Sequence, residues 1–471
     1  MKLRSGLWVA CLAALAPPAL AETPPVVFTH HVVNLDSGLH ANDTSQESVP
    51  FAQAVTVPDA QYVRVAVGDY HLGSGSYLIL RSLGDLDQQR LDAQSLPLWK
   101  HRSAIFNGDG VIVELHVAPG DSGVFASVTQ AIGGRYEPSE LPSPRSQCGA
   151  TDDRVATTDN RTGRLYFGGC TGYRVVIGPR AGTTTDEETC LTAGHCVDFD
   201  PDDGGPALPD GVLDLGGVME FNVPNSTGGG TPVAAAANDQ YPVVTAGVRW
   251  NFDGEGQGLG KDYAVFGVGR NANTGLLPFQ AYGFPFRLTR EGPAAAATIR
   301  ITGYGADTGT ANRTCQTHTG PYLTENVNGA NIWHEYQVDT EGANSGSPII
   351  WNAQNLAIGI HTNAGCDIPN GNGNSGTSFE HDPLEAALRN YVSSLARFVD
   401  ANHPLRVSEE GTVYRPYSTV SLGASGVTSG GILSIVTGSY NTAADRALTA
   451  GTGNKAMTLV APVGSVTIGA P

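Results

Sequence analysis

Short alternating runs of apolar and polar residues restrict the fold of this chain more than any other feature. Tyr62–Val67, Tyr77–Leu80 and Val111–Val117 are examples, and turns rich in Gly, Asp and Asn separate them. A half-buried strand has this period of two, whereas a helix repeats its apolar positions every three to four residues. The 60 glycines among 471 residues suit the many tight turns that such strands need. The sequence therefore predicts an all-β fold.

The runs divide the chain into regions. Residues 22–134 predict a β-sandwich, because short strands alternate there with turns. Three prolines at 135–147 predict an exposed linker. Residues 148–400 again hold short strands and Gly-rich loops, and 401–471 form a small β unit that resembles one coil of a right-handed β-helix. A single coil cannot bury a core, so we expect this unit to pack on its neighbour.

A helix is predicted at the end of the third region. Asp382 is expected to cap it, Pro383 suits its first turn, and Glu385 completes a capping box. Its apolar face consists of Leu384, Ala387, Leu388, Tyr391, Val392, Leu395 and Val399.

Residues 1–21 predict a signal for export. Lys2 and Arg4 precede a short apolar stretch, Leu7–Leu15, and Ala19–Ala21 forms a small-residue cleavage site. The stretch is too short to span a bilayer, and no later segment is apolar enough, so we predict a secreted protein. Removal of the signal leaves 25 basic against 45 acidic residues, a net charge of −20. Such a charge disfavours binding to nucleic acid or anionic membranes.

The cysteines predict disulfides. Cys11 leaves with the signal; as a lipid-attachment site it would be a lipoprotein alternative, which Trp8 argues against. An even number remains, which in an exported chain favours disulfides, and six cysteines allow 15 pairings. The chain has no Cys-x-x-Cys or His-Glu-x-x-His, so no zinc site is predicted. The six are Cys148, Cys170, Cys190, Cys196, Cys315 and Cys366.

Three segments carry the residues that a serine nucleophile requires, namely an imidazole base, a carboxylate that orients it, and N–H donors for an oxyanion. His195 follows an apolar strand and small residues in Leu-Thr-Ala-Gly-His-Cys. Asp262 directly precedes the apolar strand Tyr-Ala-Val-Phe, where it can stay buried beside an imidazole. Ser345 stands in the turn Gly-Ala-Asn-Ser-Gly-Ser-Pro, and the N–H groups of Ala343 and Ser345 would form the oxyanion hole.

Two other segments resemble a nucleophile loop. Gly120–Gly123 reads Gly-Asp-Ser-Gly, but it lacks the following Pro and lies before the histidine. Gly373–Gly376 also lacks the Pro. The Gly-x-Gly-x-x-Gly pattern at Gly371–Gly376 has no strand–helix context, so no dinucleotide site is predicted.

The order of the three motifs resembles the chymotrypsin-like serine peptidase family, in particular the bacterial branch with the glutamyl endopeptidases. The likeness covers residues 148–400. It implies two six-stranded antiparallel barrels, a catalytic cleft between them, and a C-terminal helix at 382–400. It also implies that Cys170 pairs with Cys196. With that pair set, we expect Cys315 to pair with Cys366 and Cys148 with Cys190.

The chain departs from the family at two places. Ala343 stands where the family has Gly, which suits that backbone conformation better. The separation of 67 residues between His195 and Asp262 is longer than usual, because an Asp/Gly-rich insertion includes Asp198–Asp203. Alternating Asp can bind Ca²⁺, but a solvated acidic loop is the commoner case, and no cofactor is otherwise predicted.

The cleavage preference has two interpretations. Asp339 lies six residues before the nucleophile, where trypsin-like enzymes bind Arg or Lys. Thr340 and His361 match the positions that bind a Glu side chain in glutamyl endopeptidases. The second pair favours cleavage after Glu or Asp, provided that Asp339 points elsewhere.

The sequence thus predicts a secreted serine endopeptidase that acts on proteins or peptides. A secreted binding or adhesion protein on an impaired protease scaffold is the alternative, and an esterase with the same nucleophile is a third hypothesis. The region 22–134 is equally compatible with an inhibitory pro-domain or accessory targeting domain and with a stabilising module.

Overall fold

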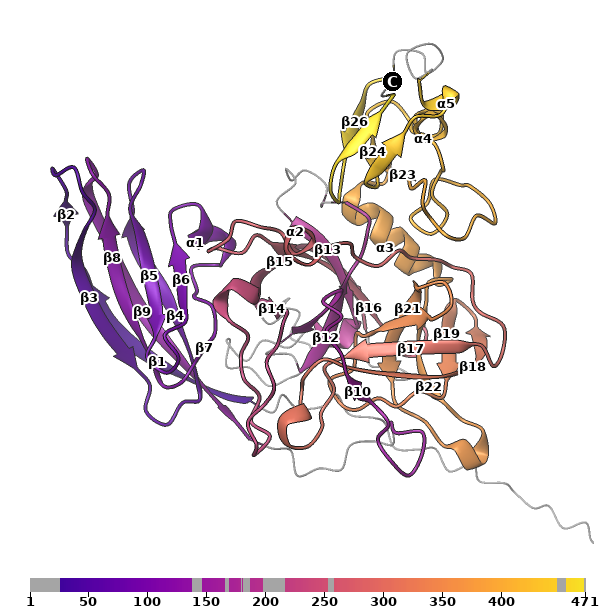
Figure 1. Ribbon diagram of the computed structural model, residues 1–471, viewed down its shortest axis with the longest axis horizontal. Helices are drawn as coiled ribbons and strands as arrows, with labels where there is room; N and C mark the ends of the chain where they lie inside the picture. Colours follow the sequence, from indigo (N-terminus) through magenta and orange to yellow (C-terminus); the bar gives the residue numbers. More distant parts are fainter. Residues whose placement is uncertain are drawn as a thin grey trace, which may run out of the picture.

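The computed structural model describes residues 26–137, 146–165, 169–178, 180, 187–197, 217–252, 258–446 and 455–469. In these residues the chain is all-β with few helices, and its N-terminal sheets, central barrel and C-terminal unit follow one another in space (Figure 1). No described helix is long and apolar enough to cross a membrane. The predicted signal and the acidic segment at 198–203 lie outside the described residues.

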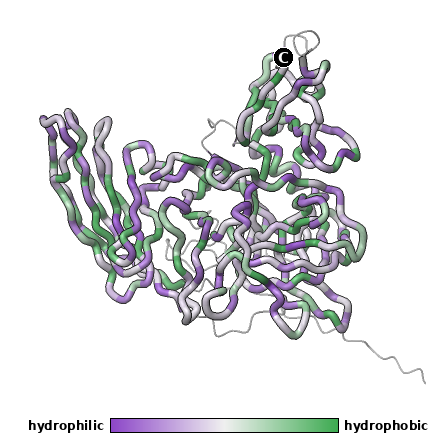
Figure 2. Tube along the Cα trace, viewed as in Figure 1, coloured by the Kyte–Doolittle hydropathy of each residue, from purple (hydrophilic) through white to green (hydrophobic). Residues whose placement is uncertain are grey.

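Two antiparallel sheets form the N-terminal region. One has the order β1-β9-β4-β7 with β2 beside β9, and the other has the order β3-β8-β5-β6. Buried side chains of both sheets, such as Val65 and Leu115, belong to one core. Figure 2 shows hydrophobic and hydrophilic residues interleaved along these strands. The strands are β1 (Val26–Asp36), β2 (His40–Ala41), β3 (Ser48–Thr56), β4 (Tyr62–His71), β5 (Tyr77–Ser82), β6 (Gln88–Leu91), β7 (Phe106–Asn107), β8 (Gly110–Val117) and β9 (Ser122–Tyr136).

A closed six-stranded barrel follows, in the order β11-β12-β13-β16-β15-β14. Every residue of β13 and β16 is buried, because these strands face the barrel interior on one side and other elements on the other. The strands are β11 (Thr162–Leu165), β12 (Cys170–Arg174), β13 (Glu187–Thr192), β14 (Val218–Glu220), β15 (Gln240–Asn251) and β16 (Tyr263–Gly269).

A seven-stranded sheet lies beside the barrel, in the order β10-β18-β17-β20-β21-β22-β19, and β18 also pairs with β19. The second closed barrel that the resemblance implies stays a prediction. The strands are β10 (Val155–Ala156), β17 (Thr298–Gly303), β18 (Gln316–Asn328), β19 (Asn331–Tyr336), β20 (Pro348–Trp351), β21 (Leu356–Asn363) and β22 (Asn374–Ser378).

The predicted helix is shorter and capped differently than expected. It is α3 (Asp382–Val392), and His381 rather than Asp382 occupies its N-cap without a side-chain hydrogen bond. Asp382 and Glu385 instead form ion pairs with Arg290, at 2.9 and 2.8 Å. The predicted capping box is therefore wrong, because both carboxylates pair with Arg290, a residue from another part of the chain, and do not bind the helix N-terminus. The other helices are short: α1 (Ser95–Leu98), α2 (Pro278–Tyr282), α4 (Val420–Gly426) and α5 (Ala443–Arg446).

The C-terminal unit contains parallel strands, as in a β-helix coil. β23 pairs with β24 and β24 with β26, while β25 pairs with β27. The unit packs on the barrel region, where the Ser434 hydroxyl donates to the Ile177 carbonyl and Arg287 pairs with Asp400. The strands are β23 (Arg397–Val399), β24 (Gly431–Ile435), β25 (Gly438–Tyr440), β26 (Met457–Val460) and β27 (Val466–Ile468).

Two of the three predicted disulfides are wrong. The Cys170–Cys196 bond is present, but Cys148 bonds to Cys366, with 5.0 Å between their Cα atoms. Cys190 is a free thiol buried in the barrel core, and Cys315 is a free thiol beside Thr162. Cys148 lies instead near β22, so Cys190 is not within its reach.

A buried ion pair joins two barrel strands. The Arg174 Nε lies 2.8 Å from a Glu188 carboxylate oxygen, and both side chains are at most 3% exposed. The other guanidinium nitrogens donate to the carbonyls of Asn160 and Gly283. Burial raises the pKa of Glu188, although Arg174 partly offsets this effect.

We expect Arg174→Ala to lower the free energy of unfolding by about 3–5 kcal/mol, because it leaves the Glu188 carboxylate buried without its cation. Urea titration followed by tryptophan fluorescence measures this change. Arg249→Ala, at an exposed position of β15, is the control and should change stability by less than about 0.5 kcal/mol. Equal effects of the two substitutions would contradict the prediction.

Candidate active site

A short turn at the end of β13 positions His195. The strand runs into the 3₁₀ turn Gly194–Cys196, and the disulfide to Cys170 ties this turn to β12. Gly194 is required because a Cβ there would lie 2.2 Å from the carbonyl oxygen of Asn251. The imidazole is 14% exposed, so it borders solvent at the rim of the barrel.

Asp262 binds His195 at two points. The His195 backbone N–H donates to Oδ1 at 3.0 Å, and Nδ1 lies 2.6 Å from Oδ2. The backbone of Asp262 is held by Thr377, whose Oγ1 accepts its N–H and donates to its carbonyl. A carboxylate only accepts, so Nδ1 carries the proton of this bond and Nε2 is left as an acceptor.

The electrostatics of this pair favour a basic imidazole. Burial by itself would lower the pKa of His195, but the charge of Asp262 and its hydrogen bond outweigh burial. The pKa of His195 is therefore raised above its usual value near 6.5. The imidazole is neutral at pH values above this raised pKa, and there it accepts a proton more readily than an ordinary imidazole does.

Ser345 lies in the turn before β20, next to the His195 turn. Its carbonyl accepts the Thr171 N–H at 2.9 Å and lies 3.9 Å from the Cys196 sulfur. Gly346 has φ +87°, and a Cβ there would meet the Thr171 carbonyl at 2.1 Å. Among the described residues His195 hydrogen-bonds Asp262, whereas no hydrogen bond joins it to Ser345.

The turn also leaves two N–H groups available. Ala343 has φ +73°, the left-handed conformation that Gly adopts without cost. The Thr171 hydroxyl donates to the Ala343 carbonyl at 3.0 Å and holds the peptide in this orientation. The N–H groups of Ala343 and Ser345 donate to no acceptor in the described part of the chain. Two such donors on one turn suit a developing oxyanion.

We expect Ala343→Gly to raise the free energy of unfolding by about 0.5–1 kcal/mol, because relief of the left-handed strain exceeds the added entropy of the unfolded chain. Chemical denaturation measures this gain. Gly371→Ala, at φ +77° in an open loop, is the reverse control and should destabilise. A loss of stability in Ala343→Gly would show that the strain is absent.

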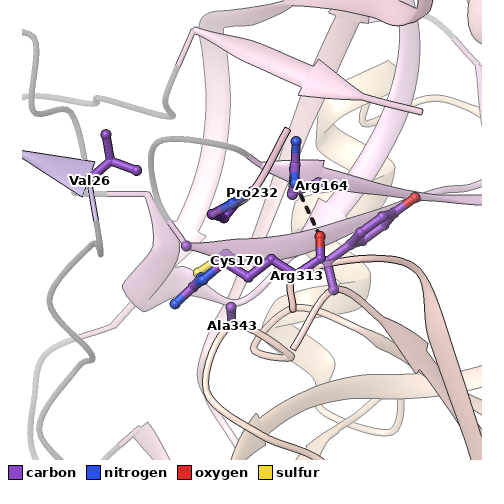
Figure 3. Close-up of a pocket in the computed structure, with 8 residues that line it drawn as sticks. Val26, Arg164, Cys170, Pro232, Arg313 and Ala343 are labelled. Atoms are coloured by element: carbon purple, nitrogen blue, oxygen red, sulfur yellow. Dashed lines mark hydrogen bonds between the residues drawn. The ribbon is translucent and has the colours of Figure 1, made fainter. Parts of the chain in front are cut away.

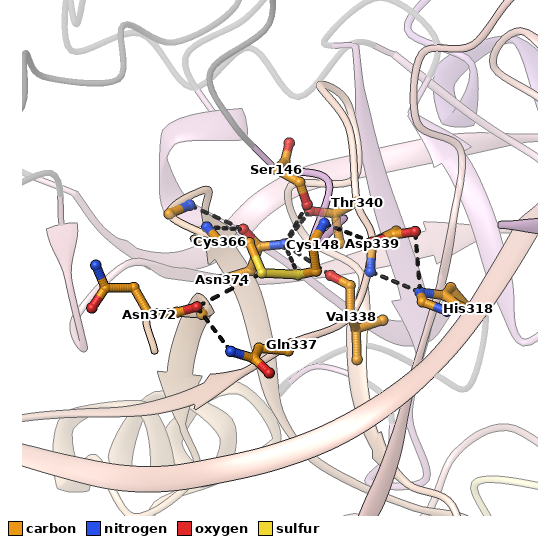
Figure 4. Close-up of a disulfide and its surroundings, with 12 residues drawn as sticks. Ser146, Cys148, His318, Gln337, Val338, Asp339, Thr340, Cys366, Asn372 and Asn374 are labelled. Carbon is orange, nitrogen blue, oxygen red and sulfur yellow. Dashed lines mark hydrogen bonds and ion pairs between the residues drawn. A yellow bond between two sulfur atoms is a disulfide. The ribbon is translucent and has the colours of Figure 1, made fainter. Parts of the chain in front are cut away.

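The Asp339 carboxylate is bound by backbone N–H groups of the 148–153 segment. Its Oδ1 accepts the Cys148 N–H at 2.7 Å, and the Asp339 backbone N–H donates to the His318 Nδ1 (Figure 4). The Asp339 Oδ2 accepts the Asp153 N–H at 2.8 Å. The Cys148–Cys366 bond holds the segment that supplies these donors. The Asp339 carboxylate is also only 3% exposed, so it is a poor partner for a substrate Lys or Arg.

Asp153, His318 and Asp339 are also close enough to one another to hold a cation. Both oxygens of Asp339 and the Nδ1 of His318 already have backbone partners, so these atoms are poor metal ligands.

The structure places Thr340 and His361 beside β22. The Asn374 side chain donates to the Thr340 hydroxyl at 3.1 Å. His361 is buried, and its Nδ1 lies 2.7 Å from the Tyr336 hydroxyl. Burial and the nearby His195 lower the pKa of His361 to about 3, so it is neutral at neutral pH.

Ser122 and Ser375, the serines of the two other segments that resemble a nucleophile loop, lie in different surroundings. Asp121, beside Ser122, accepts hydrogen bonds from the backbone and hydroxyls of the 74–76 turn, and these bonds hold the pKa of its carboxyl well below the usual value. Ser375 is buried in β22. In the described part of the chain, no hydrogen bond joins Ser122 or Ser375 to the His195 turn.

Thr171, Tyr336 and Thr377 belong to this site, but no sequence motif indicated them. Each acts through hydrogen bonds to residues far away in the chain, and an isolated Thr or Tyr in a strand carries no local signal of such contacts.

No family model matches the chain, and no curated protein matches it. Among solved structures it is similar to a Glu endopeptidase in complex with MPD, with 21% identity and a TM-score of 0.36 over 52% of this chain and 99% of that one. Protease Anisep from Arthrobacter nicotinovorans matches with 15% identity and a TM-score of 0.33, over 50% of this chain and 99% of that one. An inactivated protease paralogue of the scabies mite matches with 16% identity and a TM-score of 0.32, over 49% and 93%. With TM-scores this low, these likenesses carry no argument about what the chain does.

Proposed function

We propose that the chain is a secreted serine endopeptidase with His195, Asp262 and Ser345 as its catalytic triad. The observation that carries this proposal is the double hydrogen bond between His195 and the buried Asp262, which fixes Nε2 as an acceptor. The proximity of the Ser345 turn to the His195 turn supports the third member.

The proposed reaction follows from the donors and acceptors of this site. Ser345 Oγ attacks the peptide carbonyl while His195 Nε2 accepts its proton, and Asp262 stabilises the imidazolium. The N–H groups of Ala343 and Ser345 donate to the carbonyl oxygen as it becomes negative. His195 then protonates the leaving amine, and water attacks the acyl-enzyme by the same route.

The hydrogen bonds of Asp339 and His361 support cleavage after Glu or Asp. Asp339 is engaged by backbone N–H groups, so it does not place a second anion beside a substrate carboxylate. When the Tyr336 hydroxyl donates to Nδ1 of the neutral His361, Nε2–H is the ring donor. That donor and the Thr340 hydroxyl suit an acceptor on the substrate side chain. Thr340 is 0% and His361 4% exposed, so the side chains that cover them must move apart when a substrate carboxylate binds.

We expect kcat/KM for peptides with Glu before the cleaved bond to exceed that for matched Gln peptides by at least about tenfold, because a charged acceptor gains about 1.5–3 kcal/mol from these donors. Matched Lys peptides should be the poorest of the three. His361→Ala should lower kcat/KM for the Glu peptide by a larger factor than kcat/KM for the Gln peptide. A preference for Lys would contradict the proposed pocket and leave the triad unaffected.

A fluorophosphonate probe tests the triad directly. We expect it to label the wild-type chain at Ser345, as located by mass spectrometry. Ser345→Ala should abolish labelling, and Ser122→Ala, at an exposed position of β9, should leave it unchanged. Absence of labelling in the folded wild type would contradict the proposal and favour the binding scaffold instead.

A further inference from the structure

The N-terminal sandwich and the closed barrel share one hydrophobic core. Val63 of β4 and Phe106 of β7 belong to the same buried cluster as Val218 of β14, Ala234 and Ala237. Each of these five side chains is at most 2% exposed. Permanent interfaces are hydrophobic in this way and resemble a domain core cut in half, whereas interfaces that open and close are more polar.

Gln240 joins the two units by a pair of buried hydrogen bonds. Its Oε1 accepts the Ile105 N–H, and its Nε2 donates to the Ile105 carbonyl, both at 2.8 Å. Gln240 has no exposed surface, and Ile105 is 1% exposed. The Gln240 side chain thus pairs with the sandwich backbone as a neighbouring strand would. Separation of the units would leave these polar groups to find new partners.

Asn107 makes the reciprocal contact from the sandwich. Its Oδ1 accepts the Ala234 N–H at 2.9 Å, and its Nδ2 donates to the Ala234 carbonyl at 3.2 Å. Nearby, Asp87 accepts the Ala237 N–H at 2.6 Å, and the Asn273 side chain accepts the Arg90 N–H at 2.7 Å. The backbone of each unit is therefore bound by side chains of the other.

The sandwich also reaches the catalytic turn without covering it. Val26, the first residue of β1, lines a small pocket with Cys170, Arg313 and Ala343 (Figure 3). With the sandwich in place, Ser345 remains partly exposed and the His195 imidazole is 14% exposed. An inhibitory segment would be expected to bury these residues.

We infer that the N-terminal sandwich is a permanent component of the mature protein, and that it stays bound to the barrel when the linker is cut. It is not an inhibitory pro-domain that leaves. Shared burial and the two reciprocal amide pairs hold it to the barrel. The inference concerns assembly and does not depend on the proposed peptidase activity.

The test places a recognition sequence for a site-specific protease within residues 138–145 and cuts the full-length chain there. We expect the two fragments to elute together in size-exclusion chromatography and to appear in native mass spectrometry as one 1:1 particle. Separation of the fragments under these conditions would overturn the inference. The fluorophosphonate probe, applied before and after the cut, should label Ser345 equally; labelling that appears only after the fragments part would also overturn it.

Two double variants test which contacts hold the fragments. Asn107→Ala with Gln240→Ala should weaken association of the cut fragments by at least about tenfold, since each substitution removes the partner of two backbone groups in the opposite unit. Asn34→Ala with Gln53→Ala, at exposed sandwich positions, is the matched control and should have no effect. Equal association of both cut variants would refute the role of the amide pairs. If the first variant fails to fold, co-elution of the cut wild type still decides the inference.

Discussion

Ser345→Ala is expected to lower kcat for peptide hydrolysis by about 10⁶-fold, because without the Oγ no acyl-enzyme forms and His195 has no proton to accept. About 10³–10⁴-fold acceleration over water should remain, since the N–H groups of Ala343 and Ser345 still bind the carbonyl oxygen. The backbone contacts of this turn use the Ser345 carbonyl rather than its hydroxyl, so the variant should fold.

Single-turnover and steady-state hydrolysis of one fluorogenic peptide measure this loss. KM should change little, since the substitution removes an interaction that forms only during reaction. Ser122→Ala provides the matched control. A Ser345→Ala enzyme that retained a tenth of the wild-type kcat would show that another residue is the nucleophile.

Asp262→Asn is expected to lower kcat by about 10⁴-fold through the wrong imidazole tautomer. The His195 backbone N–H requires an oxygen at the Oδ1 position, so the amide NH₂ group must face Nδ1. Nδ1 then becomes the acceptor and Nε2 carries the proton. A protonated Nε2 cannot accept the proton of Ser345, although every atom of the site remains in place.

The pH dependence of the same variant gives an independent test. In the wild type Asp262 raises the pKa of His195, so kcat/KM should fall below a midpoint that lies above pH 6.5. In Asp262→Asn only burial remains, which lowers the pKa, so the midpoint should move below pH 6.5. Asp69→Asn, at an exposed position of β4, should leave both kcat and the midpoint unchanged. An unshifted midpoint in Asp262→Asn would mean that Asp262 does not act on His195.

Several structural elements followed from local pattern. The runs at 62–67, 77–80 and 111–117 correspond to strands β4, β5 and β8. Alternation of apolar and polar residues predicts a strand because one face of the strand is buried, whichever strand it pairs with. The prediction of α3 was also correct in place, but its cap and its end were not, because Arg290 and the pairing of β23 decide them.

The sequence by itself identified His195, Asp262 and Ser345 as candidates, because each stands in a motif of a few adjacent residues. It also indicated that Ala343 needs an unusual backbone, which the φ of +73° bears out. Only the tertiary structure determined which residues far apart in the sequence are in contact. Cys148 and Cys366 are 218 residues apart, the Asp339 carboxylate turns toward Cys148 and Asp153, and Gln240 binds Ile105 across 135 residues. Such contacts depend on where whole sheets pack, and no short stretch of sequence contains that information.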